Sequence, residues 1–127
     1  MAKMNRKEKV KFSICMPVYN GARVISPTIE SILSQGFGDF ELIIVNDKST
    51  DNSGEVVKEY KDKRIKYYEN KKNLGYSRNI EECRTKAKGD IVYLMGQDDI
   101  LATDALLNTY EAFKLSVDKF LSELNKV

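Results

Sequence analysis

The spacing of apolar residues changes repeatedly along the chain, and the changes predict strands that alternate with helices. Predominantly apolar runs, typical of strands buried on both faces, lie at residues 12–16, 40–45 and 91–95. A more polar run at 65–69 is typical of a strand at a sheet edge. Apolar residues three and four positions apart predict helices near residues 26–36, 52–60, 75–86 and 103–125.

Local signals predict where some of these elements begin and end. Pro17 is expected to stop the first strand. Ser26 before Pro27 has the pattern of an N-cap with proline at the first helical position, and Asn52 with Glu55 that of a capping box. The last helix is expected to bury its apolar stripe, which consists of Leu106, Tyr110, Phe113, Val117, Phe120 and Leu124.

The alternation predicts a Rossmann-like α/β domain, in which helices cover both faces of a parallel sheet. We expect this domain over residues 11–127, after a basic tail at 1–10. With the polar strand at an edge and the first and fourth strands inside, right-handed crossovers favour the strand order 3-2-1-4. That order places a switch point, where such sheets bind ligands, between the first and fourth strands.

Composition excludes several classes of function. A net charge of +2 gives no case for nucleic-acid binding, and the basic residues at the start are expected to be solvated. No apolar stretch approaches the ~18 residues that a membrane span needs. The absence of histidine excludes imidazole catalysis. Cys15 and Cys83 fall on apolar positions, so we expect two buried thiols in a reducing compartment, the cytoplasm.

Two adjacent carboxylates, Asp98 and Asp99, follow the fourth strand. Like charges side by side repel each other unless a cation compensates them, and Mg²⁺ commonly binds one or two carboxylates together with substrate phosphates. The pair therefore indicates a metal-assisted site for a phosphorylated ligand. Because aspartate is also a preferred N-cap, a role in starting the next helix stays open.

Polar residues also follow the first two strands, at 17–21 and 46–51. Since the carboxyl ends of parallel strands meet at one rim, these residues should lie near Asp98 and Asp99. The chain has no Gly-x-Gly-x-x-Gly after the first strand and no Walker-type Gly-Lys-Ser/Thr, which argues against nicotinamide cofactors and P-loop chemistry.

In order and spacing, several segments resemble the family-2 glycosyltransferases of the GT-A fold. They are SICMPVYN (13–20), SILSQ (31–35), DFELIIVNDKSTD (39–51), NLGYSRN (73–79), AKGD (87–90) and DD (98–99). The resemblance implies the half of the catalytic domain that binds a nucleoside diphosphate sugar, often a uridine diphosphate sugar.

The resemblance also assigns residues to the nucleotide. Pro17, Val18 and Tyr19 match the segment that lines the base pocket, and Asp47 matches the aspartate that hydrogen-bonds the base. Considered by itself, Asp47 could instead form a turn or cap, although Asp51 and Asn52 are better placed for that role. Arg78 matches a basic residue that could reach the diphosphate, with a surface ion pair to Glu81 or Glu82 as its alternative.

The acidic motif of the family holds ribose and metal. By resemblance Asp98 would contact the nucleotide, and Asp99 would bind Mn²⁺ or Mg²⁺. The chain departs from the common pattern at Gly96, where many members carry another acid.

The implied reaction is inverting transfer of the sugar to a hydroxyl of a glycan, lipid or other acceptor. Family members supply the catalytic base from an acceptor-binding half, which we expect beyond Val127, so residues 1–127 alone should be inactive in transfer. A non-catalytic nucleotide-binding module is the alternative. A receiver-like signalling domain is disfavoured, because the third strand ends in Tyr68-Glu69-Asn70 and has no aspartate to phosphorylate. We also expect self-association through apolar surface beside the fourth strand and the last helix.

Overall fold

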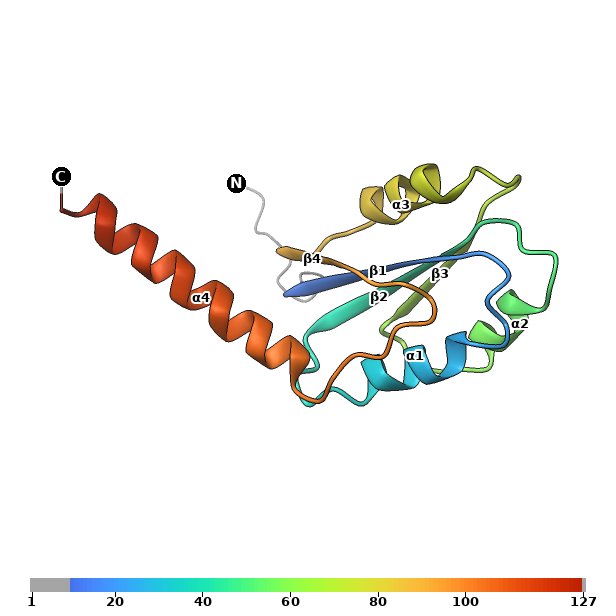
Figure 1. Cartoon of the computed structure of the whole chain (residues 1–127), viewed down its shortest axis with the longest axis horizontal. Coiled ribbons are helices and arrows are strands. Elements are labelled where there is room, and N and C mark those ends of the chain that lie inside the picture. The colour runs from blue at the N-terminus through green and yellow to red at the C-terminus, as the bar shows by residue number, and fades with distance from the viewer. Residues whose placement is uncertain (1–9, 127) are drawn as a thin grey trace, which may run out of the picture.

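The computed structural model describes residues 10–126, in which four strands alternate with four helices (Figure 1). The strands are β1 (Phe12–Val18), β2 (Phe40–Asn46), β3 (Ile65–Glu69) and β4 (Ile91–Leu94). The helices are α1 (Ile25–Leu33), α2 (Ser53–Lys58), α3 (Tyr76–Thr85) and α4 (Ala105–Leu124). The basic tail expected at 1–10 lies outside the described residues, except for Val10.

The four strands form one parallel sheet in the order β3-β2-β1-β4, as the sequence predicts. Phe12 at the start of β1 pairs with both Phe40 and Ile91, and Val18 at its end pairs with Asn46. Helices α1 and α2 cover one face of the sheet, while α3 covers the other (Figure 1). The predicted Rossmann-like three-layer α/β/α fold with the strand order 3-2-1-4 is therefore confirmed.

Alternate residues of β1 enter two separate parts of the core. Phe12, Ile14, Met16 and Val18 pack with α1, α2 and the start of α4. Cys15 belongs to a smaller cluster under α3, together with Ile43, Val45 and Cys83. Both cysteines are buried and unpaired, and burial raises the pKa of Cys15 to about 11 and that of Cys83 to about 12. The thiols therefore stay protonated at neutral pH, and their burial is as the sequence predicts.

The prediction that β4 is an inner strand covered on both faces is wrong. Within the described sheet β4 forms an edge, and its side chains alternate between packed and exposed. Ile91 and Tyr93 pack against the main core, whereas Val92 and Leu94 are 47% and 50% exposed. The reason is that α3 lies over β1 and β2, which leaves this face of β4 uncovered.

The predicted burial of the α4 stripe holds only at the start of the helix. Leu106 is fully buried and the ring of Tyr110 lies 5.2 Å from that of Phe37. Beyond Tyr110 the helix extends away from the three layers, so the rest of the stripe is exposed (Figure 1). Among the described residues, no helix combines the length and the apolar content of a membrane span.

Three predictions about element ends are also wrong. Helix α1 begins at Ile25, before Ser26, and the residues before α1 and α2 form no side-chain cap. Asp51 takes the role expected of Asn52, since its Oδ1 accepts a hydrogen bond from the Ser53 N–H at 3.0 Å. Strand β1 continues through Pro17 to Val18. The Pro17 nitrogen, which has no hydrogen to donate, faces the β4 side, and the pairing of β1 with β4 ends before it, at Cys15.

A buried polar contact ties β1 and β2 to the turn that leads into β4. The Ser13 hydroxyl donates to Glu41 Oε2 at 2.6 Å and accepts from the Gly89 N–H at 2.7 Å. The Lys88 N–H donates to the same Glu41 oxygen at 2.8 Å. A Cβ at Gly89 would lie 2.7 Å from the Phe12 backbone, so the turn can pass this close only with glycine.

Replacing the Ser13 hydroxyl tests how much this buried polar contact contributes to stability. We expect Ser13→Ala to lower the free energy of unfolding by about 1–3 kcal/mol, because it removes a donor from a buried carboxylate. Urea denaturation measures the change. The matched control is Ser34→Ala, at an exposed position just after α1, which is expected within about 0.5 kcal/mol of the parent. Equal effects of the two substitutions would contradict the assignment.

Candidate functional site

A cavity of about 480 Å³ opens at the carboxyl ends of β1, β2 and β4. It lies where the strand order predicts a ligand crevice. Five of the residues assigned from the sequence line it, namely Pro17, Val18, Tyr19, Asp47 and Asp98. Its remaining lining residues are Asn73, Gly75, Tyr76, Asn79, Gly96 and Gln97. Arg78 and Asp99 are not among them.

Asp47 is only 2% exposed, and its carboxylate fixes the loop that enters α3. Oδ1 accepts hydrogen bonds from the Leu74 N–H at 2.7 Å and the Asn70 side-chain amide at 2.9 Å. Oδ2 accepts from the Gly75 N–H at 2.9 Å. Gly75 has a φ of +91°, which glycine adopts most easily. Asp47 therefore fixes the loop before α3 and also lies at the cavity, while the cap at the start of α2 is left to Asp51.

Gln97 joins the ends of β1 and β4 across the cavity. Its Oε1 accepts from the Tyr19 N–H at 3.0 Å, and its Nε2 donates to the Tyr19 carbonyl at 3.1 Å. The Gln97 carbonyl accepts from the Thr28 hydroxyl of α1 at 2.9 Å. A Cβ at Gly21 would lie 2.5 Å from Gln97 Oε1, so glycine there leaves room for the side chain. Gln97 therefore fixes the backbone that carries the Tyr19 ring.

Sequence reasoning missed Gln97 because an amide between Gly96 and Asp98 looks like an ordinary loop residue. It also missed the cavity residues of the segment from Asn73 to Asn79, although that segment contributed to the family resemblance. The motif at 73–79 is a signal for these residues, whereas the sequence analysis assigns only Arg78 from it to the nucleotide.

Asp98 and Asp99 are both exposed, and they differ in their surroundings. Asp98 lines the cavity, whereas Asp99 turns back on its own loop and accepts a hydrogen bond from the Gly96 N–H at 3.0 Å. A Cβ at Gly96 would lie 2.8 Å from Asp99 Oδ2. Glycine at this position, where many family members carry an acid, therefore leaves room for the Asp99 carboxylate.

The described residues contain no group of three or more His, Cys, Asp or Glu side chains that could hold a metal ion. The adjacent carboxylates of Asp98 and Asp99 nevertheless suit Mg²⁺ or Mn²⁺, because these ions readily complete their shell with phosphate oxygens and water. The donor set thus fits a cation that binds together with a diphosphate.

Arg78 is exposed on the first turns of α3. The acids considered as its surface partners pair elsewhere among residues 10–126. Glu81 contacts Arg84 at 2.8 Å and Glu82 contacts Lys86 at 3.3 Å. The alternative of an ion pair with either glutamate is therefore not the arrangement found.

A family model and relatives with similar sequences all point to glycosyltransferases. The model of "Glycosyl transferase family 2" matches residues 13–118. The poly(ribitol-phosphate) beta-glucosyltransferase of Bacillus spizizenii is 35% identical over 112 residues, which cover 83% of this chain and 17% of that protein. Glycosyltransferase GlyA of Streptococcus pneumoniae is 33% identical over 103 residues, covering 80% and 15%.

Solved structures show the same likeness. S. aureus TarS in complex with UDP-GlcNAc has a TM-score of 0.76 at 28% identity, over 80% of this chain and 30% of that chain. The mannosyltransferase PcManGT from Pyrobaculum calidifontis, in complex with GDP-Man and Mn²⁺, shares the fold with a TM-score of 0.71 at 23% identity, over 77% and 30%. The chain therefore spans less than a third of each of these four proteins. The match to the family model over residues 13–118 shows that it belongs to glycosyl transferase family 2.

Proposed function

We propose that the cavity binds a nucleoside diphosphate sugar, preferably a uridine diphosphate sugar. The observation that carries this proposal is the gathering of Tyr19, Asp47 and Asp98 around one cavity at the switch point of the sheet. The sugar nucleotide named for S. aureus TarS supports the uridine preference, since that chain has the same fold at 28% identity.

Each lining residue suits one portion of this donor. Pro17, Val18 and the Tyr19 ring provide an apolar wall for the base. The Asp47 carboxylate already accepts three hydrogen bonds, so it has little remaining capacity, which suits a single N–H of the base. Asp98 also lines the cavity, and its carboxylate suits hydrogen bonds from the ribose hydroxyls.

We assign the metal to Asp99, with Mn²⁺ or Mg²⁺ as the ion. When bound, such an ion would offset the negative charge of the diphosphate. Asp99 would exchange its hydrogen bond from the Gly96 N–H for the cation, without displacing any residue of the core. Arg78 has no ion pair with Glu81 or Glu82 to break, and its guanidinium suits a phosphate at the edge of the site.

For the whole protein we propose inverting transfer to the hydroxyl of a glycan, lipid or other acceptor. The carboxylates of α4 lie at the opposite end of the sheet from the cavity, so none of them is placed as the base (Figure 1). We therefore assign the base and the acceptor site to residues of the whole protein beyond these 127. Acceptor-dependent turnover by the full-length gene product distinguishes an enzyme from the alternative, a non-catalytic nucleotide-binding module.

The two buried free thiols support a reducing compartment, and we propose the cytoplasm as the place of the reaction.

The metal assignment predicts that Mn²⁺ tightens UDP binding by about tenfold, because the cation links carboxylates and diphosphate that otherwise repel each other. Calorimetric titration of residues 1–127 with UDP, with and without Mn²⁺, measures this. Asp99→Asn should remove the dependence on Mn²⁺ and keep the binding seen without metal. Asp118→Asn on α4 is the control and should behave as the parent. Full metal dependence in Asp99→Asn would refute the role of Asp99, while UDP binding itself would stand.

The bridge from Gln97 to Tyr19 predicts that Gln97→Ala weakens UDP binding by about tenfold without Mn²⁺, because the backbone that carries the ring loses both hydrogen bonds. Gln97→Glu keeps the acceptor and should weaken binding less. The Mn²⁺-induced ratio of affinities should stay as in the parent for both variants, which separates placement of the base from the metal site. Unchanged UDP affinity in Gln97→Ala, measured by the same calorimetry, would argue against the bridge as a positioning contact.

A further inference from the structure

The cavity has a second exposed tyrosine besides Tyr19. Tyr76 is the first residue of α3 and lines the cavity, yet its side chain is 69% exposed, compared with 45% for Tyr19. Within residues 10–126, neither side chain has a hydrogen bond, an ion pair or a ring contact. Such rings contribute little to the folding of this domain, which leaves both faces of each ring available to a ligand.

The remaining tyrosines of the chain each have a partner in the structure. Tyr60 and Tyr67 form hydrogen bonds through their hydroxyl groups, Tyr68 lies under the ammonium group of Lys86, and Tyr93 and Tyr110 pack against the main core. The two tyrosines without a partner among the described residues are therefore the two that line the cavity.

The loop before α3 fixes the place of Tyr76. The Gly75 N–H, directly before Tyr76, donates to Asp47 Oδ2 at 2.9 Å, so the backbone is anchored beside the carboxylate assigned to the base. Tyr19 is held separately, by the two hydrogen bonds of its backbone to Gln97. Two different side chains thus hold the two tyrosines at one cavity.

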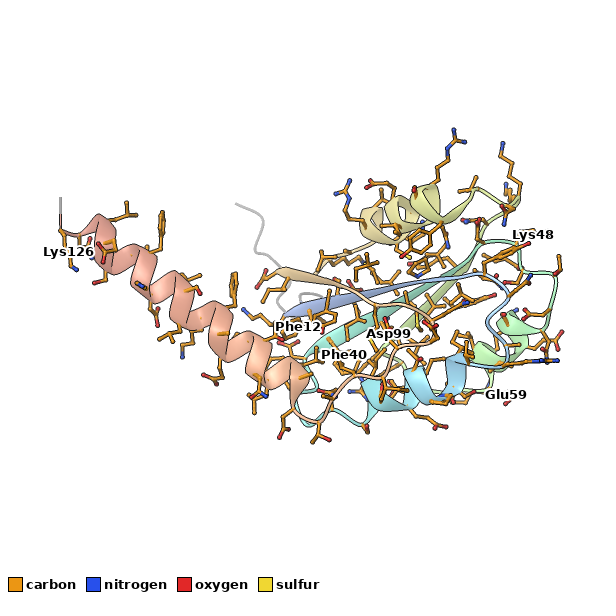
Figure 2. All side chains as sticks on the ribbon, viewed as in Figure 1. Phe12, Phe40, Lys48, Glu59, Asp99 and Lys126 are labelled. Carbon is orange, nitrogen blue, oxygen red and sulfur yellow. The ribbon has the colours of Figure 1, made fainter. Side chains whose placement is uncertain are left out.

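The metal assigned to Asp99 lies away from this loop. The segment that carries Asp99 runs beside α1, where the Leu101 N–H donates to the Ser31 hydroxyl at 2.9 Å. Figure 2 shows Asp99 on this side of the sheet, whereas α3, which begins at Tyr76, covers the opposite face. Tyr76 is therefore placed at the base end of the donor rather than at the diphosphate.

We propose that Tyr76 forms a second wall for the base, so that the base lies between its ring and that of Tyr19. The inference rests on the proposed function and deepens it, because it assigns recognition to the faces of the base as well as to its edge. Aromatic side chains stack on the π-face of any base. Asp47 would then select the base by its N–H, while the two rings supply affinity.

Calorimetric titration of residues 1–127 with UDP tests the wall. Tyr76→Ala should weaken binding by about tenfold, while Tyr76→Phe keeps the ring and should stay within about twofold of the parent. The Mn²⁺-induced ratio of affinities should be the parent's in both variants. The matched control is Tyr68→Ala, which removes a partly exposed ring outside the cavity and should leave UDP affinity unchanged. Alanine suits a helix, so circular dichroism should show that α3 is kept.

A ligand with a saturated base separates stacking from a structural effect. The diphosphate of 5,6-dihydrouridine keeps the N–H and both carbonyls of the base but has lost the planar aromatic ring. The parent should prefer UDP to this ligand, and the preference should shrink several-fold in Tyr76→Ala and persist in Tyr76→Phe. A displaced loop would weaken both ligands alike and leave the preference unchanged.

Three results would overturn the role of Tyr76. They are an unchanged UDP affinity in Tyr76→Ala, an equal preference for UDP in the parent and in that variant, and a loss seen with UDP-GlcNAc but not with UDP, which would place the ring at the sugar. With UDP binding by the parent intact, each of these leaves the proposed function standing. Absence of UDP binding by the parent would overturn both.

Discussion

The pairing of β1 with both β2 and β4 determines where the candidate site residues that follow these three strands lie. Because Phe12 pairs with Phe40 on one side and Ile91 on the other, the three strands start level and run in the same direction. The polar segments that follow them are thereby brought to one rim. β1 can hold this central place because it is buried along its whole length, with one set of side chains under α1 and the other under α3.

The order of elements and the sheet topology could be predicted because they depend on the alternation of apolar patterns, which the chain displays throughout. The faces of each strand that a helix covers could not be predicted in the same way. The run at 91–95 is as apolar as that at 40–45, yet only the second is covered on both faces, because α3 lies over β1 and β2. Apolar sequence shows what a strand can bury, whereas the position of a neighbouring helix decides what it does bury.

Helix ends show a related limit. Ser26 has the residue type of an N-cap, but α1 begins two residues earlier than this pattern predicts, because the Val24 and Ile25 N–H groups both donate to the Gly21 carbonyl. The candidate site shows the same limit of prediction from local sequence. Asp47 was found through its motif, but the three hydrogen bonds to its carboxylate depend on a loop more than twenty residues away in sequence. Gln97 acts on Tyr19 from a distant segment, so only the folded structure could reveal it.

The central claim is that the cavity beside Tyr19 is the nucleotide site. Amide chemical shifts of ¹⁵N-labelled protein during titration with UDP and Mg²⁺ test it most directly, because they locate the ligand without requiring turnover. A competing place exists at the other end of the sheet, where a basic hollow of about 590 Å³ is lined by Lys63, Lys66 and Lys88 and could attract any anion. The account predicts that the largest changes cluster at Tyr19, Gly75 and Gln97. Changes centred on the basic hollow, or spread evenly over the surface, would contradict it.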